Sequence, residues 1–212
     1  GRVVTLGKNK REGSLSLIGA VSPPGGDLTD PVVQATLRMV KVFWSLEDRL
    51  AYQRHFPAIN WLKSYSLYLD NISEFLIKEV KEDFLKLRSE AISILQEEDA
   101  LLEIVRLIGI ESVSENDKLI LEIAKSIRED FLHQHAFDPD DTYTTLKIQH
   151  RMLKVIIGFY HYCMAALEKK VRFNQLFQLK VRERISRMKY WKAEKDFDRL
   201  EEEIKKEIES LE

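Results

Sequence analysis

Apolar residues recur at intervals of three and four along most of this 212-residue chain, the spacing that lines one face of a helix. Two such stripes lie between Phe84 and Ile108, and Gly109 then provides a helix stop. Another stripe extends to Phe131 from Ser114, which begins a Ser-Glu-Asn-Asp sequence that resembles a capping box. The pattern therefore predicts a chain that is mainly α-helical beyond its N-terminal quarter.

Helical stripes continue after residues 138–141, where Asp-Pro-Asp-Asp breaks the pattern. The interval from Leu153 to Leu167 predicts one long helix, and the tail from Phe197 to Leu211 repeats apolar residues among Glu and Lys. The tail fits a short coiled coil or a plain amphipathic helix, and its length of roughly two to three heptads favours the plain helix. We expect a mainly α fold with a C-terminal helical bundle.

The N-terminal quarter differs, because it holds six of the eight glycines and four of the five prolines. Short strands are predicted at residues 3–6 and 15–21, joined by a polar turn at residues 7–13. A loop follows at residues 22–31, and a helix is predicted over residues 32–56, ending before a proline. Strands and loops should therefore be confined to the start of the chain.

Two strands do not form a stable sheet by themselves. The first residues, Gly-Arg-Val-Val, also lack an initiator Met and a signal-peptide pattern. We therefore expect the chain to be a piece of a longer protein, and its strands to be the remnant of a larger sheet.

Composition excludes several classes of protein. The chain has 33 Lys and Arg residues against 35 Asp and Glu residues, so its near-neutral charge argues against bulk nucleic-acid binding. Cys163 is the single cysteine, which rules out an intrachain disulfide or a Cys-pair zinc site and fits a reducing compartment such as the cytoplasm. No apolar run approaches the roughly 18–20 residues of a membrane span.

The sequence contains no phosphate-binding G-x-x-x-x-G-K-[ST] motif, no dinucleotide fingerprint and no common hydrolase motif, which disfavours a self-contained enzyme. His133 and His135 are the only close histidine pair; they point about 200° apart on a helix and could share a metal only on an extended segment. The basic excess over residues 169–195 fits phosphate contacts, but a solvated helical face is favoured.

Two aromatic residues lie where elements end rather than within a stripe. Phe56 precedes Pro57, and Phe137 precedes the Asp-Pro break. Residues at such ends are either ordinary core or ligand contacts, and the pattern alone leaves both possibilities open.

Several longer motifs together resemble the C-terminal portion of the catalytic A subunit of V-type and archaeal A-type rotary ATPases. The resemblance covers essentially the whole chain, and motifs of this length are highly specific. The motifs are Gly13-Ser14 with IGAVSPPGGD at residues 18–27, TLR and KVFW within residues 36–44, RHFPAINW at 54–61, SYSLY at 64–68, REDFL at 128–132 and DTY at 141–143.

This resemblance implies that residues 1–68 are the end of a P-loop nucleotide-binding α/β domain and residues 69–212 the helical bundle. The P-loop, the catalytic Glu and the Mg²⁺ ligands of such a subunit would precede residue 1. Phosphoryl transfer needs those groups to stabilise charge, so we expect no catalytic residue, no metal site and no ATP hydrolysis in this fragment alone.

The resemblance also implies particular site residues. Phe56 and Phe137 occupy the places of adenine-pocket aromatics in the related rotary ATPases. The rotor would be approached by a DLTDP-like loop and by an acidic lever that has fewer acids than its F-type counterpart, so that a packing contact is as plausible as an electrostatic one. The residues implied in rotor contact are Asp27, Thr29, Asp30, Glu111, Ser114, Glu115 and Asp117.

The implied parent couples ATP hydrolysis or synthesis to rotor rotation and H⁺ or Na⁺ transport. It would bind ATP or ADP with Mg²⁺, whereas the fragment alone is expected to bind no cofactor. Its partners would be B subunits in an alternating A₃B₃ hexamer and the central-stalk rotor, in a cytoplasmic head that is only peripheral to the membrane and binds no nucleic acid. The alternatives are a stand-alone helical interaction module and, less favoured, a metal enzyme using His133 and His135.

Overall fold

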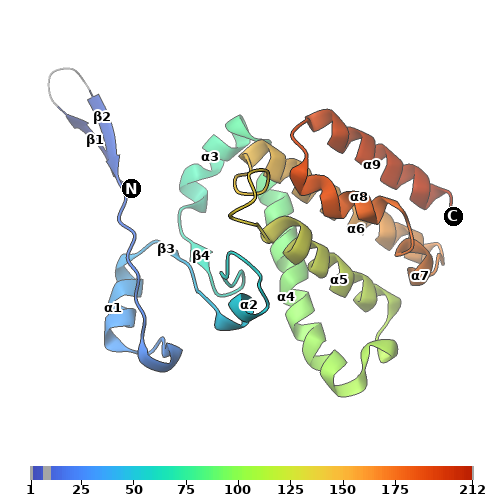
Figure 1. Ribbon diagram of the computed structural model, residues 1–212, viewed down its shortest axis with the longest axis horizontal. Coiled ribbons are helices and arrows are strands. Elements are labelled where there is room, and N and C mark those ends of the chain that lie inside the picture. The colour runs from blue at the N-terminus through green and yellow to red at the C-terminus, as the bar shows by residue number, and fades with distance from the viewer. Residues whose placement is uncertain (1, 7–10, 212) are drawn as a thin grey trace. The chain divides into compact units, whose positions relative to one another are not determined.

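The computed structural model describes residues 2–6 and 11–211, with side chains from Gly13 onward (Figure 1). The chain divides into two compact units, residues 1–41 and residues 42–212. The sequence-based boundary between residues 68 and 69 separates domains of the implied parent and stays a prediction.

The first unit is an antiparallel hairpin followed by a loop and a helix. Its strands pair Arg2 with Leu15 and Leu6 with Arg11. Asp30 caps the helix, because its Oδ1 accepts hydrogen bonds from the backbone N–H groups of the second and third helical residues. The elements are β1 (Arg2–Leu6), β2 (Arg11–Leu15), the 3₁₀ turn η1 (Pro24–Gly26) and α1 (Pro31–Met39).

The second strand does not occupy the predicted interval of residues 15–21. It spans Arg11–Leu15, and residues 16–22 have no regular structure. Part of the predicted polar turn, residues 7–10, lies outside the described residues. Leu17 and Ile18 are exposed, so the burial that would favour a strand over this apolar run is missing.

The helix predicted over residues 32–56 is also shorter than expected. It ends at Met39, and the following residues form β3 (Val42–Phe43), which pairs with β4 (Tyr65–Ser66). A separate short helix, α2 (Asp48–Tyr52), comes before the proline. β-branched and aromatic residues after Met39 favour an extended backbone over a helix, and pairing with β4 stabilises the extended conformation.

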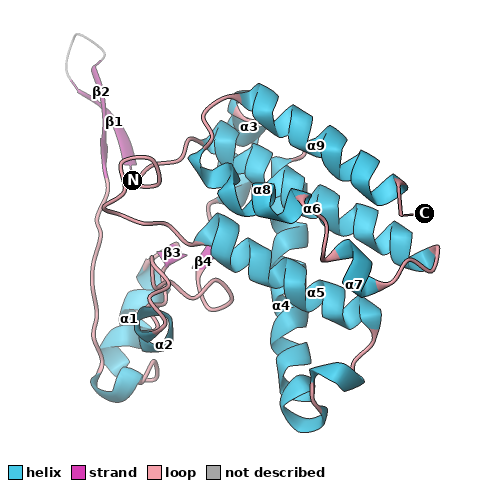
Figure 2. Cartoon of the chain, turned by 45° about the vertical axis from the view of Figure 1, so that its right-hand side comes forward, coloured by secondary structure: helices cyan, strands magenta, loops and turns pink. Residues whose placement is uncertain are grey.

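The second unit consists mostly of helices, as the sequence predicted (Figure 2). The predicted stripes between residues 84 and 108 belong to one continuous helix, which stops at Gly109 with φ of 82°. The helices are α3 (Leu69–Glu79), α4 (Phe84–Ile108), the 3₁₀ turn η2 (Ile110–Ser112), α5 (Glu115–Ser126), the π-helix η3 (Ile127–Leu132), α6 (Leu146–Glu168), α7 (Phe173–Leu176), α8 (Val181–Arg187), the 3₁₀ turn η4 (Met188–Tyr190) and α9 (Glu194–Glu209).

The core of the bundle surrounds α6, which packs against α4, α5 and α9. The tail is a plain amphipathic helix, as predicted, and it packs against α6. Its buried residues are Phe197, Leu200, Ile204 and Ile208. Cys163 is fully buried, and this burial raises the pKa of its thiol to about 12, so it is an unreactive core residue.

Replacing Phe197 with Ala should destabilise the chain by about 3–5 kcal/mol, because the ring is fully buried and its removal leaves a cavity. Urea unfolding measures this difference. The same substitution at Phe75, which lies exposed on α3, is the matched control and should cost much less. Equal losses at the two positions would contradict the assignment of α9 to the core.

Candidate functional site

The loop that carries Phe56 is ordered by its own polar side chains. Asn60 Oδ1 accepts hydrogen bonds from the N–H groups of Leu62 at 2.9 Å and Lys63 at 2.8 Å, and its Nδ2 contacts the Glu47 carboxylate. The Phe56–Pro57 peptide bond is cis. The Phe56 side chain is left 48% exposed. The hydrogen bonds of Asn60 therefore fix the backbone of a loop that presents an aromatic ring at the surface.

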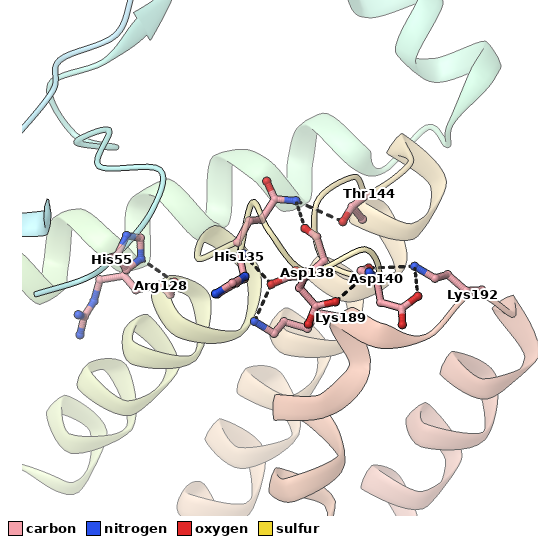
Figure 3. Close-up of polar contacts among 10 residues, drawn as sticks. His55, Arg128, His135, Asp138, Asp140, Thr144, Lys189 and Lys192 are labelled. Carbon is pink, nitrogen blue, oxygen red and sulfur yellow. Dashed lines mark hydrogen bonds and ion pairs between the residues drawn. The ribbon is translucent and has the colours of Figure 1, made fainter.

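This loop is hydrogen-bonded to the segment that leads to Phe137. His55 Nε2 donates to the carbonyl oxygen of Arg128 at 2.9 Å (Figure 3). The N–H of Gln134 donates to the carbonyl oxygen of Phe56 at 2.7 Å. The ring centroids of His55 and His133 lie 5.3 Å apart. Residues 55–56 and 128–134, far apart in the sequence, are thus held side by side.

The loop between η3 and α6 carries Phe137 and is organised by Asp141. This carboxylate is only 1% exposed, and its Oδ2 accepts hydrogen bonds from the N–H of His135 at 2.8 Å and from Lys189 Nζ at 3.0 Å (Figure 3). Lys192 adds contacts to Asp140. The Phe137 side chain is 92% exposed. A buried ion pair therefore holds a loop whose aromatic ring points to solvent.

The structure brings the two predicted adenine-pocket residues onto adjacent segments. Both side chains are exposed at the surface. A cavity of about 160 Å³ lies beneath the Phe137 loop, but its walls come from other residues: Phe131, Leu132, His133, Gln134, Asp141, Thr144, Gln149, Met152 and Lys189.

Two groups near the loops, the half-buried His133 and the buried Glu98 of α4, have shifted pKa values. Burial lowers the pKa of His133, and the positive charges of Lys189 and His55 lower it further. Burial raises the pKa of Glu98, and Arg128 opposes that rise. His133 is therefore preferentially neutral in the folded chain.

The predicted rotor-contact loop in the first unit is shaped by its own side chains. Asp27 Oδ1 accepts hydrogen bonds from the N–H of Thr29 at 2.8 Å and from its hydroxyl at 2.7 Å, and these bonds lower the pKa of Asp27. Asp30 caps α1. The polar residues of this loop thus fix its conformation.

The second predicted rotor-contact region is the tip between α4 and α5. Ser114 Oγ accepts a hydrogen bond from the N–H of Asp117, whose carboxylate accepts one from the N–H of Ser114, which is the predicted capping box. Glu111 and Glu115 lie exposed at the surface. Lys118 Nζ lies 3.8 Å from a carboxylate oxygen of Glu111.

Sequence analysis missed the apolar character of this tip. Ile108 was assigned to a core stripe but is exposed, and Leu107 is 85% exposed. Leu107 lies off the buried stripe, and that position was the available signal. Ile108 lies on the stripe, seven residues after buried Leu101, so its spacing predicted burial and gave no such signal. The exposed apolar residues of the tip are Ile104, Leu107, Ile108 and Ile110.

Sequence analysis also missed the buried polar residues that fix the aromatic loops. Asp141 was noted only as part of a motif, and Glu98 was not singled out. Within residues 2–6 and 11–211, no group of three or more His, Cys, Asp or Glu residues is placed to hold a metal ion. No helix in that part of the chain is long and apolar enough to span a membrane.

His133→Gln should reduce the loss of stability on acidification. Because the folded-state pKa of His133 is lowered, the unfolded chain takes up its proton first, and stability falls as the pH drops below about 6.5 until it passes the folded-state pKa. Urea unfolding at pH 7.5 and 5.5 measures the difference, with His135→Gln controlling for the loss of a histidine. An unchanged pH dependence in His133→Gln would contradict the burial argument.

Two family descriptions match the chain in sequence. Residues 2–66 match the nucleotide-binding domain of the ATP synthase alpha/beta family, and residues 73–177 match the C-terminal domain of V and A type ATP synthase. The two matches together cover most of the chain. The first lies at the N-terminal end, and the second lies within the helical part.

Curated relatives match the chain over its whole length. It is 56% identical to the V-type ATP synthase alpha chains of Thermoanaerobacter pseudethanolicus and Acetivibrio thermocellus, and 53% identical to that of Clostridium perfringens. The chain spans 36% of the length of each of these relatives. This chain belongs to the V-type ATP synthase alpha chain family, of which it represents a part that includes the C-terminal domain.

Proposed function

We propose that the chain is the C-terminal part of the catalytic subunit of a V/A-type ATPase, coupling ATP hydrolysis or synthesis to rotor rotation and ion transport. The observation that carries this proposal is the pairing of two loops that present exposed aromatic rings, Phe56 and Phe137, on a bundle whose longest helix ends in an exposed apolar tip. The two aromatic rings suit a nucleotide base, and the apolar tip suits a protein partner.

Phe56 and Phe137 would form one wall of the adenine site. An adenine base is flat and apolar on its faces, so that an aromatic ring can stack on it. The backbone hydrogen bond between Gln134 and Phe56 and the Asp141–Lys189 pair hold the two loops before a nucleotide arrives. Such preorganisation reduces the entropy lost on binding.

The phosphates and Mg²⁺ would be held by parts of the parent subunit outside this chain. We propose that the chain alone does not hydrolyse ATP, because phosphoryl transfer requires a phosphate cradle and a metal. The complete subunit would alternate with B subunits in a hexameric head that is peripheral to the membrane.

The tip between α4 and α5 would press on the central rotor by packing rather than by charge. Ser114 and Asp117 are engaged in capping α5, which leaves Glu111 and Glu115 as the exposed acids of the tip, and Glu111 is itself paired with Lys118. Leu107 and its apolar neighbours provide the larger contact surface. The loop that holds Asp27, Thr29 and Asp30 would supply a second rotor contact.

Phe137→Ala should weaken nucleotide binding to the assembled ATPase by about tenfold, a loss of about 1–3 kcal/mol of stacking. Titration with a fluorescent ATP analogue measures the affinity. Phe137→Tyr should retain most of it, because the ring is kept. Phe75→Ala, at an exposed aromatic on α3, is the matched control and should bind as the unchanged protein does.

Unaltered nucleotide affinity in Phe137→Ala and Phe56→Ala would contradict the adenine-site assignment. If both variants also assembled normally with their partners, the alternative of a helical interaction module without nucleotide binding would be favoured.

Leu107→Ser should weaken binding of the isolated rotor subunit to the assembled head by about tenfold, because burial of a leucine contributes about 1.5–3 kcal/mol. Glu111→Gln should change the affinity by less than about threefold, as expected for an exposed charge. Surface plasmon resonance compares the two variants. A larger effect of Glu111→Gln, together with a strong salt dependence, would show that the contact is electrostatic.

A further inference from the structure

Arg128 lies where three segments of the second unit meet. It belongs to η3, and its carbonyl oxygen accepts a hydrogen bond from His55 Nε2 at 2.9 Å (Figure 3). The same oxygen accepts a hydrogen bond from the N–H of His133, also at 2.9 Å. Its Nη2 donates to Glu98 Oε1, in the middle of α4, at 2.7 Å. One residue thus contacts the Phe56 loop, the start of the Phe137 loop and the longest helix.

The π-helical turn makes this double use of the carbonyl possible. The bond from the N–H of His133 to the carbonyl of Arg128 spans five residues, one more than in an α-helix. The wider turn leaves the same oxygen accessible to His55. π-helical turns of this kind occur frequently at functional sites, and here the turn lies directly before the Phe137 loop.

The ion pair of Arg128 with Glu98 is mostly shielded from water. The Glu98 side chain is 6% exposed, and burial raises its pKa despite the nearby guanidinium. Arg128 Nε is buried without a hydrogen-bond partner among the described residues. A buried pair with an incompletely satisfied donor is a poor means of gaining stability compared with apolar packing. Its presence is better explained by a need for fixed geometry.

α4 extends from this pair to the rotor-facing tip without interruption. Glu98 lies ten residues before Ile108, which corresponds to roughly 15 Å of helix at 1.5 Å per residue. The apolar contacts between α4 and α5 are non-directional and allow small sliding movements. A short charged hydrogen bond instead fixes the position of α4 along its own axis relative to Arg128.

We infer that Arg128 is a positioning residue that links the nucleotide-side loops mechanically to α4. Its backbone carbonyl is hydrogen-bonded to the loop that carries Phe56 and to the start of the loop that carries Phe137, and its guanidinium forms an ion pair with Glu98. A displacement of those loops on nucleotide binding is passed through this pair to α4 and so to the tip. The inference rests on the proposed function, because it assumes that the loops contact nucleotide and the tip contacts the rotor.

Arg128→Met in the assembled ATPase tests this link. The substitution removes the guanidinium and keeps the backbone carbonyl that holds both loops. Nucleotide affinity should stay within about twofold of the unchanged enzyme, whereas revolutions of a bead attached to the rotor per ATP hydrolysed should fall several-fold. Glu98→Gln should act in the same direction, and Arg128→Lys should restore part of the coupling.

The matched control is Arg151→Met. Arg151 also forms an interhelical ion pair, from α6 to Asp198 and Glu201 of α9, and its Nε is likewise buried without a partner in the described chain. It contacts neither of the aromatic loops nor α4 in any described hydrogen bond or ion pair. Its loss should lower stability but leave the revolutions per ATP unchanged.

The double variant Glu98→Met with Arg128→Met covers the case in which a single variant fails to fold, because it leaves no buried charge unpaired. Loss of coupling in the stable double variant supports the inference. Normal coupling in the double variant, or equal effects of Arg128→Met and Arg151→Met, overturns it. If instead Phe137→Ala leaves nucleotide affinity unchanged, the proposed function fails independently of this result.

Discussion

The carbonyl group of Arg128 is the point on which the arrangement of the Phe56 and Phe137 loops depends. Buried backbone oxygens require hydrogen-bond donors, and this one takes two, from His55 and His133. The bond from His55 joins the segment matched by the nucleotide-binding domain to the segment matched by the helical C-terminal domain. The N–H of Gln134 donates another hydrogen bond, to the carbonyl oxygen of Phe56, so the two segments are held side by side at two points.

The rest of the second unit supports that surface and separates it from the tip. The apolar core around α6 fixes the helices, and Asp141 ties the Phe137 loop to Lys189 near the C-terminal helices. Polar residues are thus buried where loops must be fixed, while Phe137 and Leu107 remain exposed where partners are proposed. Exposed apolar side chains carry a cost in water, and a ligand or partner that covers them would remove that cost.

Helical periodicity predicted most of the bundle, since each stripe faces the core and caps such as Ser114 and Gly109 act locally. It failed at residues 15–21 and 40–56, where the outcome depends on which strand lies beside the segment, and periodicity carries no such information. Phe56 and Phe137 stood out by their places at element ends, but their predicted role at adenine came only from the family resemblance. The polar residues beneath them were not, because Glu98 pairs with a residue 30 positions away and only the fold brings the two together.

The central claim is that the Phe56 and Phe137 loops contact adenine. Photolabelling of the assembled ATPase with 2-azido-ATP tests it directly, because the azide on the base reacts with whatever lies beside the ring. The account predicts that mass spectrometry finds the label in peptides covering residues 54–61 and 133–143, and that excess ATP prevents it. Protectable labelling confined to other segments of the subunit would contradict the account.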